Sequence, residues 1–129
     1  MKRIVALLGV LVLVLAACGG GEDSGGDGAN GNNLPSAGDA AAGEEIYTST
    51  CAACHGADAT GIEGLGKDLY NNAFVNGLSD AELVDFINEG RGADHPDNET
   101  GVAMPPKGGN PSLDDDDLMD VVAYLRTLK

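Results

Sequence analysis

Basic and aromatic side chains are scarce in this sequence, and tryptophan is absent. Seven Lys and Arg residues stand against 21 Asp and Glu residues, a formal net charge of -14 at pH 7, which excludes nucleic-acid binding through a basic surface. Three Tyr and two Phe are the only aromatic residues among 129, so a core built from protein side chains alone would be small. Domains with so little apolar surface to bury often need a crosslink or a bound group for stability. We therefore expect a non-peptide group in the core.

Alternation of apolar and polar residues, which is typical of strands, is also lacking, whereas three segments repeat apolar residues at helical spacing. The first segment begins with Asp39 as N-cap and extends to about Thr50. The second begins with a capping box formed by Ser79 and Glu82, and Gly90 marks its end. Both segments have the length of ordinary globular helices.

The third segment has the clearest helical pattern. Asp114 is placed as its N-cap, acidic residues crowd its first turn, and Arg126 and Lys129 lie near its end, as the helix dipole favours. Its apolar side is formed by Leu118, Val121, Val122, Leu125 and Leu128. Three helices and no strands predict an all-α domain.

The first 17 residues predict a bacterial lipoprotein signal peptide. Two basic residues precede a run of 14 apolar or glycine residues over positions 4–17, which is short for a bilayer span and typical of a signal h-region. Residues 15–18 read LAAC, which resembles the signal in which the cysteine is acylated through its sulfur and becomes the new N-terminus. We expect Cys18 to carry lipid and to anchor the protein on the extracytoplasmic side of a bacterial membrane. An uncleaved anchor helix and plain secretion are the alternatives.

A glycine-rich stretch follows the predicted lipidation site. Eight of the twenty residues from Gly19 to Gly38 are glycine, and Leu34 is the only large apolar side chain among them. Such a composition cannot offset the entropy of ordering, so residues 18–37 are expected to form a flexible tether with a span on the order of 25 Å. The folded domain is expected to comprise residues 38–129.

The run CAACH, which contains Cys51, Cys54 and His55, is the pattern for covalent attachment of a c-type haem. Two residues between the thiols let both reach the vinyl groups of one porphyrin, and the adjoining histidine can then ligate the iron. A thiol–disulfide redox pair would require a βαβ setting. A structural zinc would have to use His95 as its fourth ligand. Lipid on Cys18 and two thioethers account for all three cysteines, which favours haem.

Residues 38–129 resemble a small class I monohaem cytochrome c. The resemblance rests on Gly43 and Tyr47 before the haem motif, CAACHG itself, Met104-Pro105-Pro106, and the closing Ala123-Tyr124-Leu125. It implies three main helices packed around one covalently bound haem, with the first and last helices crossing beside it. Gly43 then matches the small residue at the crossing and Tyr47 the aromatic residue one turn later, with Val121 and Tyr124 as their partners.

Met104 is the candidate for the second axial ligand of the iron. It lies 49 residues after His55 in a loop rich in glycine and proline that cannot be helical, and the ligand methionine of the resembled family is likewise followed by proline. His95 is the rival ligand, whereas Met119 is expected to pack inside the third helix or to be partly exposed. A thioether ligand favours ferrous iron, so a His/Met haem has a higher reduction potential than a bis-His haem.

The loop between the haem motif and the second helix departs from the family at one position. Gly61, Gly64 and Gly66 predict a flexible loop rather than a phosphate-binding fingerprint, because the required spacing and the preceding strand are missing. The family has a proline after the last glycine, and its carbonyl binds the proximal histidine. Lys67 stands at that place here. The substitution keeps a carbonyl but loses the fixed φ of proline.

These observations predict a membrane-tethered one-electron carrier between respiratory or photosynthetic partners, and not an enzyme. Both iron positions would be filled, and no nucleophile and base occur together. The acidic balance favours redox partners with a basic docking surface, although a solvated surface or adaptation to high salt would also produce it. The alternatives are a fixed haem subunit of a membrane oxidoreductase complex and, from another class, a haem-based ligand-binding or sensor protein.

Overall fold

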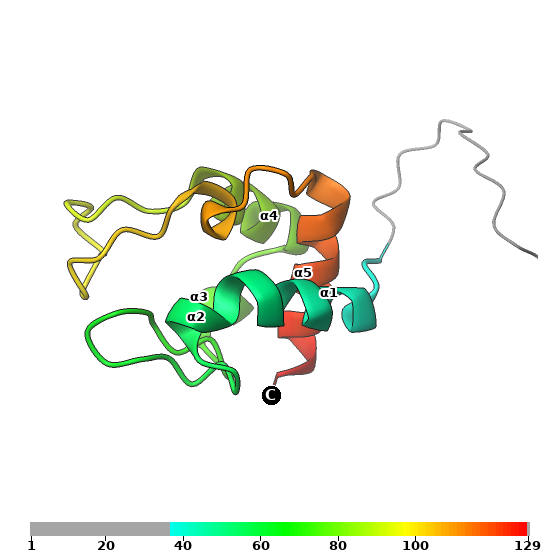
Figure 1. The fold of residues 1–129 in the computed structure, drawn as a ribbon, viewed down its shortest axis with the longest axis horizontal. Helices are drawn as coiled ribbons and strands as arrows, with labels where there is room; N and C mark the ends of the chain where they lie inside the picture. The colour runs from blue at the N-terminus through cyan, green and yellow to red at the C-terminus, as the bar shows by residue number, and fades with distance from the viewer. Residues whose placement is uncertain (1–36, 129) are drawn as a thin grey trace, which may run out of the picture. The chain divides into compact units, whose positions relative to one another are not determined.

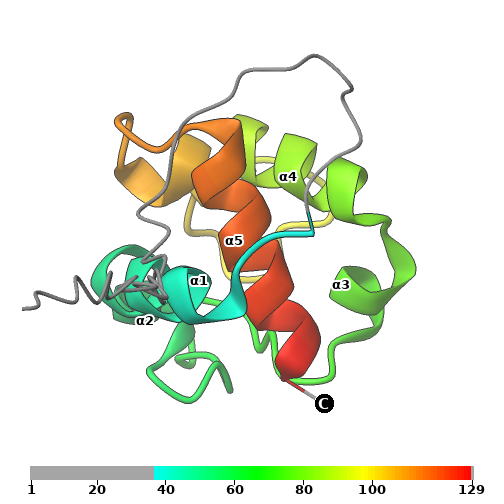
Figure 2. The same cartoon turned by 90° about the vertical axis from the view of Figure 1, so that its right-hand side faces the viewer.

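The computed structural model describes residues 37–128, so the predicted signal peptide and Cys18, with nearly all of the tether, lie outside the described residues. Figures 1 and 2 show the arrangement of the helices. They are α1 (Ala40–Ile46), the π-helical turn η1 (Tyr47–Cys51), α2 (Ala52–His55), α3 (Ala73–Gly77), α4 (Asp80–Glu89), the 3-10 turn η2 (Pro106–Gly109) and α5 (Asp115–Thr127). Residues 37–128 contain two isolated β-bridges and no strand, which confirms the all-α prediction. Every helix within residues 37–128 is too short or too polar to span a bilayer.

The first helical segment is longer than predicted. The side chain of Asp39 accepts hydrogen bonds from the backbone N–H groups of Ala41 and Ala42, as expected of the N-cap. The chain then stays helical through η1 and α2 to His55, beyond the predicted end at about Thr50. In η1 the N–H of Ala52 bonds to the carbonyl of Tyr47, the wider spacing of a π-turn. The haem motif is therefore presented by a helix and not by a loop.

The crossing of α1 and α5 is as close as the family resemblance implied. A Cβ atom on Gly43 would lie 1.9 Å from the carbonyl oxygen of Asp120, so only glycine allows this approach. One turn later the rings of Tyr47 and Tyr124 pack with their centroids 5.2 Å apart. Val121 is buried at the same crossing. The predicted partners are thus confirmed.

The core lies between α1, α4 and α5. The largest of its fully buried side chains are Tyr47, Leu118, Val121 and Val122. Leu125 completes the predicted apolar side of α5, while Leu128 lies just after the end of the helix and is half-buried. Each large apolar side chain that is fully buried stabilises the fold by about 1.5–3 kcal/mol relative to exposure. The long apolar row of α5 therefore organises the domain.

Both long helices begin with capping boxes. Ser79 and Glu82 form the predicted box of α4, and Gly90 is its C-cap. Helix α5 has a second box between Asp114 and Asp117, which the sequence analysis did not identify because Glu or Gln is the usual third-residue partner. These caps satisfy backbone N–H groups that the first helical turn leaves without acceptors.

Arg126 ties α5 to the segment between α3 and α4. Its guanidinium forms an ion pair with Asp80 at 2.9 Å and donates hydrogen bonds to the carbonyls of Val75 and Leu78 at 2.6 and 2.7 Å. The sequence pattern indicated only the favourable place of Arg126 in the helix dipole, and it did not predict α3. The signal for α3 was Asn72, whose side chain caps it by accepting from the N–H groups of Phe74 and Val75.

Candidate functional site

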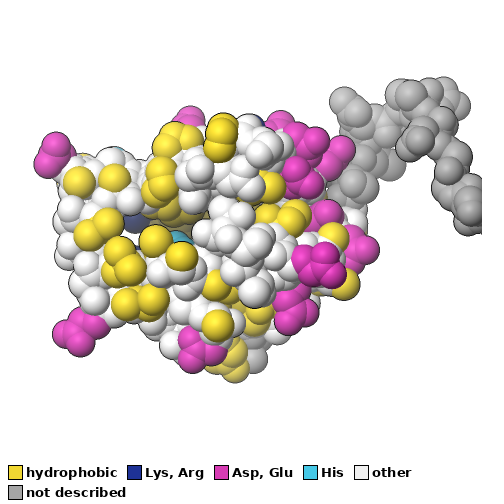
Figure 3. All heavy atoms as spheres, viewed as in Figure 1, with side chains coloured by type: hydrophobic (Ala, Val, Ile, Leu, Met, Phe, Trp, Pro, Cys, Tyr) yellow, Lys and Arg dark blue, Asp and Glu magenta, His cyan; other side chains and the backbone are white. Residues whose placement is uncertain are grey.

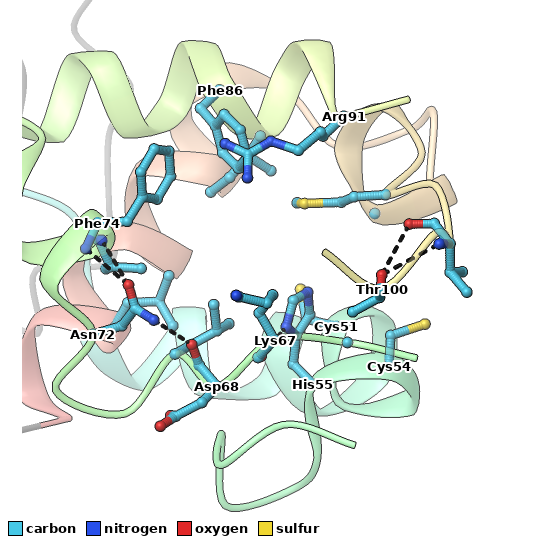
Figure 4. A pocket seen from close by; sticks show the side chains of 18 of the residues that line it. Cys51, Cys54, His55, Lys67, Asp68, Asn72, Phe74, Phe86, Arg91 and Thr100 are labelled. Carbon is cyan, nitrogen blue, oxygen red and sulfur yellow. Dashed lines mark hydrogen bonds between the residues drawn. The ribbon is translucent and has the colours of Figure 1, made fainter. Parts of the chain in front are cut away.

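A cavity of about 470 Å³ lies among the haem-motif segment, α3, α4, α5 and two long loops. Its size is in the range of cofactor sites, and its walls are mainly apolar. Figure 3 shows the mouth of this cavity framed by hydrophobic side chains, and Figure 4 shows the side chains that project into it. Cys51, Cys54, His55 and Met104 all line it. The structure therefore brings the four residues predicted from separate motifs to one place.

The two cysteines of the motif are half-buried and exposed, respectively, and neither is in a disulfide. Burial, together with the nearby thiol of Cys54, raises the pKa of the Cys51 thiol to about 11. Thiol–disulfide enzymes depend on the opposite, a lowered thiol pKa that yields thiolate near neutral pH. The described residues also lack the sheet of that fold class. The dithiol alternative therefore does not fit this site.

His55 is oriented by the backbone of the neighbouring loop. Its Nδ1 lies 2.8 Å from the carbonyl oxygen of Lys67. A carbonyl only accepts, so Nδ1 must carry the proton, and Nε2 keeps its lone pair for a metal. A Cβ on Gly66 would lie 2.1 Å from the carbonyl oxygen of Cys54, so the loop reaches the helix only because this residue is glycine. Lys67 thus fulfils the role of the family's proline carbonyl.

The loop contains a tight turn. Ile62 and Gly66 form a β-bridge, and the N–H groups of Leu65 and Gly66 both donate to the carbonyl of Ile62. At Gly56, directly after the haem motif, the backbone carbonyl accepts a hydrogen bond of 2.7 Å from the hydroxyl of Tyr47. These hydrogen bonds hold the backbone of a loop that has lysine rather than proline at position 67.

Met104 is held against the end of α4 by its backbone. It forms a β-bridge with Arg91 through two hydrogen bonds, each 2.8 Å long, and its side chain packs against the core. It lies outside the helices, as predicted for this loop. Met119 is partly buried against the core and does not line the cavity, which agrees with its predicted packing role.

His95, the rival ligand, lies outside the cavity. Its side chain is 47% exposed, and its Nδ1 accepts a hydrogen bond from the N–H of Asp97. Among residues 37–128 no group of three or more His, Cys, Asp or Glu side chains could hold a metal ion, so the zinc alternative also does not fit. Met104 lines the cavity together with His55, whereas His95 does not.

The cavity residues that the sequence did not predict include Arg91, Phe74 and Phe86. The guanidinium carbon of Arg91 lies 4.9 Å from the ring centroid of Phe74 and 4.8 Å from that of Phe86, and the two rings pack edge to face. The only signal in the sequence was a basic residue directly after the helix-ending Gly90. Lys67 and Glu99, which also line the cavity, form an ion pair.

A family model described as "Cytochrome C oxidase, cbb3-type, subunit III" matches residues 38–125. The chain belongs to the cytochrome c family. Cytochrome c domains are electron carriers that act outside the cytoplasm, and membership implies one covalently bound haem c.

Curated cytochromes support this membership. The chain is 34% identical to "Cytochrome c-555" of Prosthecochloris aestuarii over 88 residues, 67% of this chain and 85% of that protein. It is 36% identical to "Cytochrome c-555" of Chlorobaculum thiosulfatiphilum over 87 residues, 67% of this chain and 93% of that protein. The "Cbb3-type cytochrome c oxidase subunit CcoP" of Rhodobacter capsulatus is 31% identical over 90 residues, 69% of this chain but only 29% of that protein.

The residues of this cytochrome c domain fit a covalent haem. Two free thiols, an imidazole with an available nitrogen and a thioether line one largely apolar cavity. The walls include Phe74 and Val102, which are 45% and 39% exposed although they are large and apolar. A planar apolar group in the cavity would cover such surfaces. A haem in this cavity would be the non-peptide group that the composition predicts for the core.

Proposed function

We propose that this cytochrome c domain holds haem through thioethers at Cys51 and Cys54, with His55 and Met104 as the two axial ligands. The observation that carries the proposal is that these four side chains line one cavity. The haem supplies an iron centre that takes up and releases one electron. His55 offers Nε2 because the Lys67 carbonyl occupies Nδ1, and the soft sulfur of Met104 favours ferrous iron and a high potential.

We further propose that the protein is a carrier and not an enzyme. His55 and Met104 would both bind the iron, which would leave it no position for a substrate, so the haem would serve only to transfer electrons. Phe74 and Val102 form an apolar rim there, and Asp68, Asp97 and Glu99 are exposed cavity residues beside it. A redox partner with basic groups around an apolar contact would complement this surface, with an association rate that falls as salt rises.

Charge is distributed unevenly over the domain. Figure 3 shows acidic side chains gathered over α1 and the start of α5, away from the cavity mouth. Acidic residues at that end include Glu44, Glu45, Asp115 and Asp116, all of them exposed. The net acidic charge favours long-range attraction of a basic partner, whereas close contact at the mouth depends on the apolar rim and the acidic residues beside it.

Membrane tethering is part of the same proposal and rests on the sequence pattern. Cleavage after residue 17, lipid on Cys18 and a Gly-rich tether would keep the haem domain at an extracytoplasmic membrane surface while it moves between donor and acceptor. Such a tether raises the effective concentration of the domain without adding contacts. Replacing Cys18 by Ala should release the protein into the soluble fraction, measured by membrane flotation. Continued membrane association would contradict lipid anchoring and favour a retained apolar anchor.

A fixed subunit of a membrane oxidoreductase is the second candidate function. It is favoured by the family description, which names an oxidase subunit, and by the similarity to the CcoP subunit. A fixed subunit would co-purify with its complex in constant ratio, even in high salt. A carrier would instead separate, because it must bind its partners weakly.

Absorption spectroscopy of the purified oxidised and reduced protein tests the haem assignment. We expect a pigment that acid–acetone does not extract, and a weak long-wavelength sulfur-to-iron band in the oxidised form. Carbon monoxide should bind the reduced protein slowly or not at all at neutral pH. A colourless protein or an extractable pigment would contradict covalent haem, and rapid carbon monoxide binding would favour the sensor alternative.

A further inference from the structure

Arg91 follows the C-cap of α4 and lies directly opposite Met104. The two residues exchange both backbone hydrogen bonds of an isolated antiparallel bridge, each 2.8 Å long. Directly opposed residues of such a pair project to the same side of the backbone. Both side chains accordingly line the cavity. Figure 4 shows the guanidinium of Arg91 turned into the cavity beside Phe86, on the side opposite His55 and Lys67.

The guanidinium of Arg91 is held in place mainly by aromatic rings. Its central carbon lies within 5 Å of the centroids of both Phe74 and Phe86. Among the described residues, the carbonyl of Asp97 adds one polar contact by accepting a hydrogen bond from Nη1 at 3.3 Å. Arginine has five N–H donors in a planar fork, so most of them remain available on the cavity side.

Among the basic residues of positions 37–128, Arg91 is the one that combines aromatic contacts with the lack of a carboxylate partner. Lys67 is paired with Glu99, Arg126 with Asp80, and Lys107 donates to the carbonyl of Leu113. Within residues 37–128 Arg91 has no carboxylate at ion-pair distance, and the carboxylate of Asp97 lies nearer to His95. A half-buried cation at an apolar cavity is costly unless an anion pairs with it. We therefore expect the group that occupies the cavity to carry the anion that pairs with Arg91.

We propose that Arg91 binds a propionate carboxylate of the haem through its free N–H groups, and that its charge raises the reduction potential. The proposal rests on the haem assignment made above. A carboxylate matches the planar fork of arginine in two parallel hydrogen bonds. The positive charge beside the porphyrin favours the ferrous state, since reduction adds a negative charge. Arg91 is thus a positioning residue that orients the haem edge and tunes its electron affinity.

The test compares three variants of the full-length haem-loaded protein. Arg91→Gln removes the charge, Arg91→Lys keeps it without the fork, and Arg126→Gln makes the same substitution at an arginine outside the cavity. The reduction potential is measured at fixed salt, and the propionate bending vibration is followed by resonance Raman spectroscopy. The sulfur-to-iron band reports whether Met104 stays bound.

We expect Arg91→Gln to lower the potential and to shift the propionate vibration. Arg91→Lys should keep most of the potential while still shifting the vibration, because one ammonium cannot reproduce a two-pronged contact. Arg126→Gln should lose stability but retain both signals. If Arg91→Gln also loses the sulfur-to-iron band, a shifted propionate vibration in Arg91→Lys with that band intact still supports the proposal.

An unchanged propionate vibration in both Arg91 variants would overturn the proposal, even if the potential moved, because the effect would then come from the Met104 bridge. A potential that falls equally in Arg126→Gln would overturn the assigned tuning role. These outcomes presuppose covalent haem in the wild-type protein. Absence of that haem would instead be the failure of the proposed function, so the two failures are distinguishable.

Discussion

The α1–α5 crossing and the haem-motif cavity are built on opposite principles. At the crossing, the space beside Gly43 is so tight that a single methyl group would collide with the backbone of Asp120. At the cavity, large apolar side chains such as Phe74 remain about half exposed. The first region is completed by protein atoms, and the second is completed only by a bound group. The crossing therefore contributes mainly to the stability of the fold, whereas the cavity provides the binding site.

The largest effect should follow from preventing haem attachment. We expect a protein with both Cys51→Ser and Cys54→Ser to lose covalent pigment and most of its cooperative unfolding, since the cavity walls lose their cover. The loss should be comparable with the whole net stability of a domain, roughly 5–15 kcal/mol. Thermal melts followed by far-UV circular dichroism measure it. Cys18→Ser is the matched control and should retain both pigment and melting temperature.

A colourless double variant that melts at the wild-type temperature would show that the protein core is complete without haem. The contrast between the two regions would then be wrong.

The second largest effect concerns the ligand rather than the fold. Met104→His should lower the reduction potential by a substantial part of the roughly 0.8 V range open to axial ligation, because imidazole lacks the preference of a thioether for ferrous iron. Redox titration measures the change. His95→Gln is the control and should leave the potential unchanged, because His95 lies outside the cavity. The reverse result would identify His95 as the axial ligand.

The crossing itself can be broken with one methyl group. Gly43→Ala should destabilise the domain by about 3 kcal/mol, the upper part of the usual range for overpacking, because the atom it meets belongs to the backbone. Chemical denaturation of the haem-loaded protein measures the loss. Gly77→Ala is the matched control, since a Cβ there has no neighbour within 4 Å, and should be close to neutral. Equal stability of the two variants would refute the tight crossing.

The smallest effect is expected at the boundary of the two regions. Tyr47 belongs to the crossing through its ring and reaches the haem-motif segment through its hydroxyl, which donates to the carbonyl of Gly56. Tyr47→Phe should keep the packing and cost about 1 kcal/mol for the lost hydrogen bond. Its denaturation midpoint should fall while the sulfur-to-iron band persists. A loss of that band would mean that Tyr47 supports the ligands directly.

Helical periodicity and capping were sufficient to predict the main helices. The capping box of Ser79 and the N-cap Asp39 depend on contacts within one turn, which a local pattern contains. Helix α3 was missed because it has only five residues and a single N-cap, Asn72, as its signal. The continuation of the first helix through the haem motif was also missed, because its π-turn interrupts the regular spacing on which the prediction relied.

The loops around the cavity show where prediction from sequence ends. Lys67 was recognised as a departure from the family, but only the folded loop shows its carbonyl 2.8 Å from His55. Arg91 carried no motif at all, and its place beside Phe74 and Phe86 depends on a bridge to a residue 13 positions later. Contacts of this kind depend on the path of irregular backbone, for which neither period nor cap exists.

The sequence by itself determined the helical class and the haem chemistry, because helix periodicity, N-caps and the CAACH spacing are short-range properties of neighbouring residues. Only the tertiary structure decided which distant groups face the cavity. It places Met104 inside the cavity and His95 outside it, aims the Lys67 carbonyl at His55, and gives Arg91 no carboxylate partner within residues 37–128. The physical reason is that these choices depend on how two glycine-rich loops close against a common core, and such closure is a property of the whole fold.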